Sequence, residues 1–161
     1  VGADAITFVK QFVAAGGKTK TKLAWLGYSE NYIPGLTRDE SEGIVTVANF
    51  ISTLDKPEAR AFAAKVRKRF GDDAIVSNTV DAHYMLTRFF IEGIKRAGAV
   101  DKEKIIDAVT GFQLQSGNGM VRLRSEDRHA DLNVVIAETR NQKQVLLKDL
   151  GAIKASSQCK A

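Results

Sequence analysis

A short, continuous apolar run at residues 23–26 (LAWL) is the feature that most restricts the fold of this chain. A run of this kind, with neither helical nor alternating periodicity, is typical of a strand buried on both faces of a parallel sheet. Residues 6–13 before it carry apolar side chains at helical spacing, and the glycines at 16 and 17 end that pattern. A helix, a polar connection over residues 18–22 and a buried strand make half of a repeating parallel unit. The sequence therefore predicts an α/β fold with a parallel sheet, and the chain is expected to begin just past a strand of that sheet.

A second helix is predicted to open near residue 57 and to end at Gly71. Asp55 can cap it, because a carboxylate at this position accepts hydrogen bonds from the first backbone N–H groups. Its inward stripe is predicted to consist of Phe62, Val66 and Phe70, which recur at four-residue spacing.

Two more helices are predicted before residue 111. The longer one covers about residues 79–97 and carries a broad apolar face that includes Phe89 and Phe90, which we expect to pack in the core. The shorter one is capped by Asp101, and Gly111 closes it.

The remaining segments favour extended structure. Residues 42–51 form a β-rich stretch between the first strand and the second helix. After a turn at residues 116–119, residues 120–124 are a strand candidate, and residues 134–137 and 145–147 are predicted to pair as a C-terminal hairpin.

Composition excludes several classes of protein. The net charge is +5, but the basic residues are spread over separate segments without interleaved aromatic residues, so no nucleic-acid partner is predicted. No run of about 18 apolar residues is present to span a membrane. The single Cys159 supports neither a disulfide framework nor a metal site. The first residues lack Met and the features of a signal peptide, which suggests a processed or truncated chain.

The strongest enzymatic alternative is the segment 27–31 (GYSEN), which follows a strand as the nucleophile elbow of α/β hydrolases does. Ser29 would be the nucleophile, with His83 or His129 as the base. Asn31 replaces the second glycine of that motif, and a proline-glycine pair follows too soon for the long helix that the motif requires. We therefore predict no catalytic residue.

Two further motifs have some features of ligand sites. Residues 117–119 (GNG) precede a strand rather than a helix, so they do not form a dinucleotide loop. Residues 126–129 (EDRH) place acidic residues beside a histidine, but no second ligand group stands at metal spacing. The sequence predicts no metal and no cofactor.

The loop after the first strand is the best candidate for a binding site. In open α/β sheets, ligands bind beyond the carboxyl ends of the strands. Tyr28 and Tyr32 offer aromatic faces and hydroxyls there, Ser29 a hydroxyl and Glu30 a carboxylate. These groups suit a pocket for a small hydrogen-bonding ligand, although the same residues could also decorate a surface turn.

A set of segments in a fixed order carries a family resemblance: residues 1–5 (VGADA), 26–30 (LGYSE), 41–43 (SEG), 49–58 (NFISTLDKPE), 81–84 (DAHY), 119–123 (GMVRL), 126–129 (EDRH) and 135–138 (VIAE). Their order and spacing resemble the branched-chain amino acid, urea and amide group of type I periplasmic binding proteins. Residues 49–58 are most similar to the amide- and urea-binding branch. The resemblance runs through nearly the whole chain.

The resemblance implies a two-lobed fold of which this chain is the C-terminal part. Residues 1–47 would belong to the second lobe, and residues 48–114 would supply a crossing strand and the closing helices of the first lobe. Residues 115–161 would form a hairpin that returns to the hinge. The side of the cleft formed by the second lobe would then contain Tyr28, Ser29 and Glu30, together with Ala3 and Asp4.

The function implied by the resemblance is that of the solute-binding component of an ABC-type importer in the periplasm, which is not an enzyme. Its solute would be an amide, urea or a branched-chain amino acid, bound by hinge closure. Its protein partner would be the membrane permease, with a homodimer as a further option. A cytoplasmic amide sensor of the same fold is the alternative.

Overall fold

The computed structural model describes residues 2–154, so Cys159 lies outside the described residues. The helices are α1 (Ala3–Ala14), α2 (Gly17–Lys20), α3 (Arg38–Ser41), α4 (Pro57–Phe70), α5 (Asn78–Ala97) and α6 (Lys102–Val109), with a 3-10 helix, η1 (Glu30–Gly35). The strands are β1 (Val45–Ala48), β2 (Gln113–Ser116), β3 (Gly119–Leu123), β4 (Ala130–Arg140) and β5 (Lys143–Ile153). Within these residues no helix combines the length and the apolar character that a membrane crossing needs.

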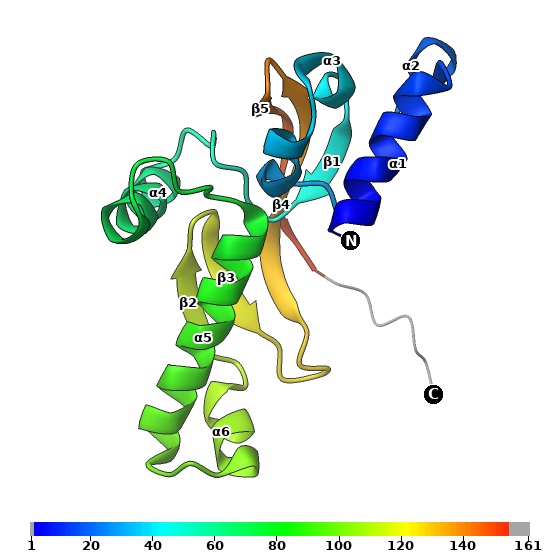
Figure 1. The fold of residues 1–161 in the computed structure, drawn as a ribbon. Helices are drawn as coiled ribbons and strands as arrows, with labels where there is room; N and C mark the ends of the chain where they lie inside the picture. The colour runs from blue at the N-terminus through cyan, green and yellow to red at the C-terminus, as the bar shows by residue number, and fades with distance from the viewer. Residues whose placement is uncertain (1, 155–161) are drawn as a thin grey trace.

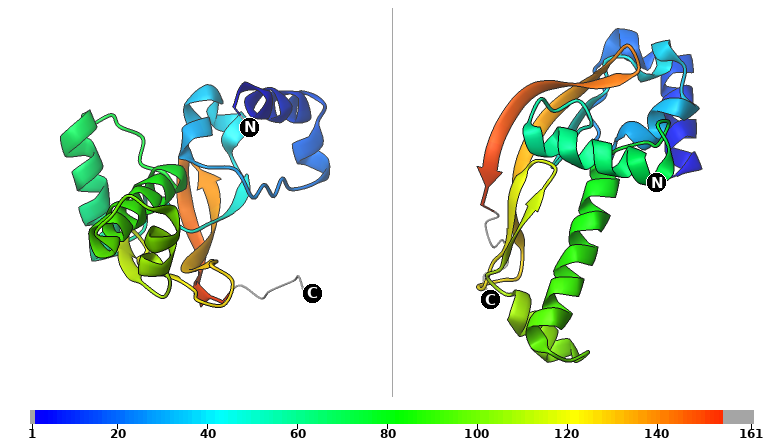
Figure 2. Two further views of the ribbon diagram at one scale, coloured as in Figure 1. Left: turned by 90° about the horizontal axis from the view of Figure 1, so that it is seen from below. Right: turned by 90° about the vertical axis from the view of Figure 1, so that its left-hand side faces the viewer.

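Strand β4 connects the two ends of the molecule (Figure 1). The strands pair in the order β1-β4-β3-β2, and β5 also pairs with β4. The second half of β4, from Val135 to Glu138, pairs with β1, whereas Ala130 and Asp131 at its start pair with β3. One end of β4 therefore lies with β1 and α1, and the other lies with β2, β3 and α5 (Figures 1 and 2).

The α/β class is confirmed, but the sheet differs from the parallel one that the sequence predicts. All pairings between the named strands are antiparallel. A parallel contact occurs among the described residues as the bridge between Ala24 and Val45, where Trp25 N–H donates to the Val45 carbonyl (2.8 Å). The prediction that residues 23–26 are buried on both faces is wrong, since Leu26 is 76% exposed. In the described part of the chain this segment has a strand on one side only, so alternate side chains face solvent.

The predicted helices are confirmed, with corrections at both ends of α4. Lys56 is the N-cap residue and its side chain makes no capping bond, while the carboxylate of Asp55 pairs with Arg60 instead. At the other end, Phe70 is 73% exposed, whereas Phe62 and the remaining member of the predicted stripe are buried. Phe70 is the last residue of the helix, so it extends past the core that the rest of the stripe covers.

Helix α5 buries only part of its broad apolar face. It ends at Gly98, whose φ of 63° suits a left-handed cap. Met85 and Phe89 are buried, but Leu86 is 65% exposed and Phe90 is 54% exposed. The prediction that Phe90 packs in the core is therefore wrong for the part of the chain that the structure describes.

The C-terminal hairpin is confirmed and is longer than predicted. Its turn residues Asn141 and Gln142 have positive φ values of 51° and 58°, as a two-residue type I′ turn requires. Strand β2 was not predicted, because its residues (QLQS) have little β propensity; it forms by pairing with β3. The polar connection after α1 contains the short helix α2.

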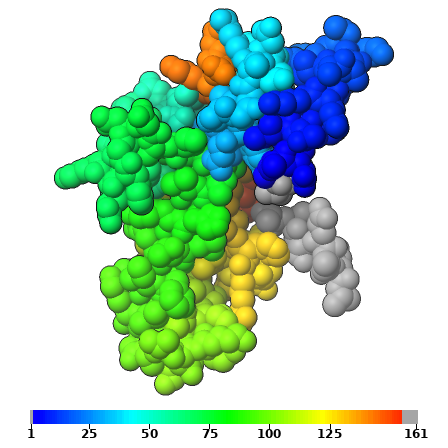
Figure 3. Space-filling model, in the orientation of Figure 1, coloured from blue at the N-terminus to red at the C-terminus, as the bar shows by residue number. Residues whose placement is uncertain are grey.

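Buried hydrophobic residues form three clusters along the chain. The N-terminal cluster lies between α1, η1 and β1: Val9, Tyr28, Ile33, Leu36 and Ile44. The central cluster contains Ala48, Phe50, Ile51, Leu54, Ala59, Phe62, Ala63, Val66, Val76, Val135 and Ala137. The α5 cluster contains Met85, Phe89, Leu114 and Val121. In the space-filling view, the N-terminal part and the part around α5 and α6 form separate bulges that meet in the middle of the molecule (Figure 3).

Candidate functional site

The predicted site residues Tyr28, Ser29 and Glu30 directly precede or begin η1. All three are buried, with exposed fractions of 0%, 2% and 8%. They therefore do not decorate a surface turn. They also do not project freely into solvent, so a ligand could reach them only from a neighbouring groove or after a movement of the chain.

Tyr28 is fixed by packing and by its backbone. Its ring lies 5.7 Å from that of Trp25 and 5.9 Å from that of Tyr32, measured between centroids. Its carbonyl accepts a hydrogen bond from the Thr46 hydroxyl on β1 (2.9 Å). Burial raises the pKa of Tyr28 to about 12; the nearby Thr139 hydroxyl lowers it, and the charge of Glu30 adds to the increase. The phenol therefore stays protonated at any physiological pH.

Glu30 connects η1 to the segment that follows β1. Its Oε1 atom accepts a hydrogen bond from the backbone N–H of Ser52 (2.7 Å). Burial raises the pKa of the Glu30 carboxyl, and the hydrogen bond from Ser52 opposes this increase. One oxygen of the carboxyl is thus held by Ser52, and burial favours the neutral form of the group more than in an exposed glutamate.

Glu30 and three other buried side chains, those of Tyr28, Thr139 and Gln144, form a polar cluster. Glu30 Oε2 and both polar atoms of Gln144 have no hydrogen-bond partner among the described residues, whereas the Tyr28 and Thr139 hydroxyls interact with each other without reaching full hydrogen-bond geometry. Thr139 on β4 and Gln144 on β5 are directly paired across the hairpin. Tyr28 is close enough to both Thr139 and Glu30 for each to affect its pKa. An unpaired buried polar group costs about 1–3 kcal/mol, so this cluster has an unmet capacity to donate and accept hydrogen bonds.

A surface groove of about 230 Å³ lies beside this cluster. Glu30, Ser52 and Gln144 line one side, and Arg67 with the segment after α4, residues 73–76, lines the other. The groove thus lies between η1 and β5 on one hand and α4 on the other. No local pattern in the sequence points to Gln144 or Thr139, because their place beside Glu30 depends on the long-range pairing of β4 and β5.

Ala3 and Asp4 do not join this groove. Both are exposed in the first turn of α1, next to Gly2, whose φ is 75°. The structure thus brings Tyr28, Ser29 and Glu30 together and leaves the other two predicted residues apart from them.

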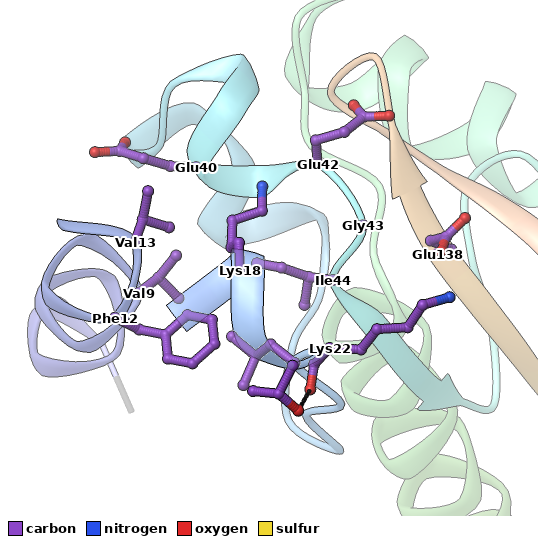
Figure 4. Close-up of a pocket in the computed structure, with 12 residues that line it drawn as sticks. Val9, Phe12, Val13, Lys18, Lys22, Glu40, Glu42, Gly43, Ile44 and Glu138 are labelled. Carbon is purple, nitrogen blue, oxygen red and sulfur yellow. Dashed lines mark hydrogen bonds between the residues drawn. The ribbon is translucent and has the colours of Figure 1, made fainter. Parts of the chain in front are cut away.

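A second pocket, of about 200 Å³, was not predicted from the sequence (Figure 4). Its apolar side is formed by Val9, Val13 and Ile44, in the space between α1 and β1. Charged residues surround the opening, and Lys22 extends toward Glu138 in the view of Figure 4. Helical periodicity predicted that Val9 and Val13 face inward, but it could not show that their contact with the sheet leaves a space.

The geometry does not support the hydrolase alternative. Ser29 is 2% exposed, so its hydroxyl is not presented to solvent as a nucleophile would be. His83 lies on α5 and is exposed rather than partly buried; its Nδ1 atom is 2.8 Å from the Thr79 carbonyl oxygen. His129 lies near the start of β4 beside Asp127. Among residues 2–154, no three His, Cys, Asp or Glu side chains are grouped so that they could hold a metal ion.

Comparison with family models identifies a family for this chain. The family model described as "Periplasmic binding protein" matches residues 1–144. The Leu/Ile/Val-binding protein homolog 6 of Brucella melitensis is 26% identical over 147 residues, which cover 85% of this chain and 36% of that protein.

Two solved structures from R. palustris, both of ABC-transporter solute-binding proteins, are also similar. One, in complex with 4-hydroxybenzoate, is 28% identical with a TM-score of 0.76 and is matched over 95% of this chain and 43% of its own. The other, in complex with benzoate, is 20% identical with a TM-score of 0.82, over 100% of this chain and 44% of its own. The chain thus spans less than half of each of these three proteins. From the family match, the chain belongs to the periplasmic binding protein family.

Proposed function

We propose that this chain forms the C-terminal part of the solute-binding receptor of an ABC-type importer. The receptor binds a small polar solute by hinge closure and does not transform it. The observation that carries the proposal is the passage of the chain between two bodies. On β1, the Thr46 hydroxyl donates to the Tyr28 carbonyl of the N-terminal part. Asn49, the residue after this strand, is bonded instead to Asp81 on α5 and to Asn118 between β2 and β3. Two bodies joined by crossing strands can rotate to enclose a solute between them.

The proposed lobes follow the division expected from the sequence. Residues 1–47 form part of the second lobe, residues 48–114 the crossing strand and closing helices of the first, and residues 115–161 the returning hairpin and the tail after it. The separate N-terminal and α5 clusters support this division. The exposed side chains of Leu86 and Phe90 support it too, because the rest of a first lobe would cover that face of α5.

The chemistry around Glu30 favours a neutral amide or urea as the solute. Such a solute can donate N–H groups to the Glu30 carboxyl and accept a hydrogen bond from the amide of Gln144. A branched-chain amino acid, as the name of the Brucella relative suggests, would pair its ammonium group with Glu30 or Asp4. A benzoate, as in the R. palustris complexes, would be repelled by Glu30 unless that carboxyl were protonated.

A thermal-shift screen of the protein that carries this chain tests the proposal. Urea, short amides, leucine-type amino acids and benzoates are compared at millimolar concentration. Urea has about four heavy atoms, which limits its binding free energy to about 6 kcal/mol and its Kd to tens of micromolar. At 100 times the Kd a ligand stabilises by about 2.7 kcal/mol, so the melting temperature should rise by several degrees. A shift with benzoates alone would replace the amide assignment, and a shift with none of these classes would count against the proposed receptor site.

Labelling with a fluorophosphonate tests the statement that the protein is not an enzyme of the serine-hydrolase type. We expect Ser29 to stay unlabelled, because its hydroxyl is buried and neither His83 nor His129 lies on the same part of the fold. Covalent labelling that the variant Ser29→Ala abolishes would contradict this expectation. The receptor itself would be periplasmic, and its partner would be the permease in the membrane. A homodimer is tested separately by its mass in solution.

A further inference from the structure

A buried polar cluster holds the crossing segment immediately after β1. The carbonyl of Asn49 accepts a hydrogen bond from the side-chain amide of Asn118 (2.8 Å). The side-chain amide of Asn49 donates to the Asp81 carboxylate (3.1 Å). Asn118 is 2% exposed and Asp81 is 1% exposed, whereas Asn49 is partly buried, so water has limited access to these bonds. The backbone carbonyl and the side-chain amide of Asn49 are thus both bonded to the body that contains α5.

The turn between β2 and β3 is the centre of this cluster. Asp81 accepts a second hydrogen bond, from the backbone N–H of Gly117 (2.9 Å). A Cβ atom at Gly117 would lie 2.7 Å from the Phe50 ring, so only glycine lets the turn approach the crossing segment this closely. The turn is therefore in direct contact with both Asn49 and Phe50.

Asn118 also bonds to the elements on either side. Its Oδ1 atom accepts from the Lys56 ammonium group (2.7 Å), and Lys56 in turn pairs with Asp149 on β5 (2.7 Å). Its carbonyl accepts from the side-chain amide of Asn133 on β4 (2.6 Å). The side chain of Asn118 thus contacts the crossing segment after β1, and its backbone carbonyl contacts the crossing strand β4.

Within a few residues of each crossing element, the hydrogen-bond partners change from one body to the other. Thr46, on β1, is bonded to Tyr28 of the N-terminal part, whereas Asn49 is bonded to Asp81 and Asn118. On β4, Asn133 is bonded to Asn118, and the β4–β5 pairing is irregular between Val134 and Ala137. Residues 47–48 lie between the two sets of bonds, and the irregular stretch of β4, residues 134–137, lies beside them and largely pairs with β1.

We propose that Asn118 is a positioning residue that restricts bending between the two bodies to residues 47–48 and 134–137. It does so by holding Asn49 and Asn133 to the same turn. The inference rests on the proposed two-lobed function but concerns the place of the hinge rather than the solute. Loss of the Asn118 amide removes its bond to the Asn49 carbonyl and leaves Asn49 held to the turn only through Asp81. The crossing segment can then bend over a longer stretch.

A distance measurement between two spin labels tests this in the chain itself, without any solute. The labels are attached at Lys20→Cys on α2 and Thr87→Cys on α5, both exposed positions, in a background with Cys159→Ser. We expect one narrow distance distribution in the parent chain. In Asn118→Ala we expect a second population that exceeds about 10% of the molecules, because a two-state protein ordinarily holds its minor state below about that level. Asn118→Asp keeps the acceptor for Lys56 but loses the donor to Asn49, so it should show the same second population while the fold is retained.

Asp101→Ala is the matched control. It removes the side-chain cap of α6, where the Asp101 carboxylate accepts from the Lys104 N–H (2.9 Å), and so lowers stability at a place outside the crossing. We expect its distance distribution to equal that of the parent chain. Distributions for both Asn118 variants that coincide with the parent would overturn the inference. Because no solute is involved, that result is distinct from a failure of the proposed receptor function, which the thermal-shift screen reports.

Discussion

Replacing Phe50 by alanine should lower the free energy of unfolding by about 3–5 kcal/mol, the usual loss for a buried phenylalanine. Phe50 is 0% exposed, and its ring meets that of Phe62 edge-on at 5.5 Å between centroids. The backbone of Gly117 packs against the same ring, so a cavity there cannot be filled by a small shift of one side chain. Urea denaturation of the chain and of the variant, followed by circular dichroism, measures the difference.

Phe70→Ala is the control for this prediction, since it removes the same side chain from the surface. Phe70 is 73% exposed at the end of α4, and its one ring contact of note is with the guanidinium of Arg69, 5.6 Å from the ring centroid. We expect a change within about 0.5 kcal/mol, as for most surface substitutions. Equal losses in the two variants would mean that the central cluster is not the core that the structure describes.

Helix α4, which ends at Phe70, shows what the sequence could and could not predict. Helical spacing placed Phe62 and Phe70 on one stripe of α4, and that stripe exists, but periodicity does not tell where the neighbouring core ends. Local signals were sufficient for the ends of α5, because glycine and capping residues act within a few positions. The exposure of Leu26 and Phe90 depends on which other elements are nearby, which no local pattern contains.

The candidate site was predicted in part for the same reason. Tyr28 and Glu30 could be found because they follow a strand in sequence, and the structure brings them together. Gln144 and Thr139 could not be found, since they are more than 100 residues away along the chain and reach Glu30 only through the β4–β5 hairpin. Burial of the site was missed because three polar residues in a row are ordinarily typical of an exposed turn.

Replacing Glu30 by glutamine should stabilise the chain at pH 7.5, and the gain should disappear as the pH falls below about 4, near the pKa of a glutamate in the unfolded chain. Burial raises the pKa of Glu30 in the folded chain, so the folded state keeps its proton at pH values where the unfolded state has lost it. Stability of the parent therefore falls as the pH rises from the unfolded pKa through the folded pKa. The amide of glutamine is neutral throughout and can still accept the Ser52 N–H bond, so a gain of about 1–2 kcal/mol is expected at neutral pH.

Glu40→Gln gives a control of the opposite sign. The Glu40 carboxylate accepts from the backbone N–H of Thr37 (2.7 Å), and that hydrogen bond lowers its pKa. Its contribution is present above the unfolded pKa and is lost as the pH falls through the lower folded value, so Glu40→Gln should slightly destabilise the chain at pH 7.5 and have no effect in acid. Denaturation curves at several pH values separate the two cases. A Glu30→Gln variant that is less stable than the parent at pH 7.5 would contradict the prediction. It would show that interactions in the folded chain offset the cost of burying the Glu30 charge. Glu30 would then stabilise η1 as a charged group rather than being a buried acid available to a neutral solute.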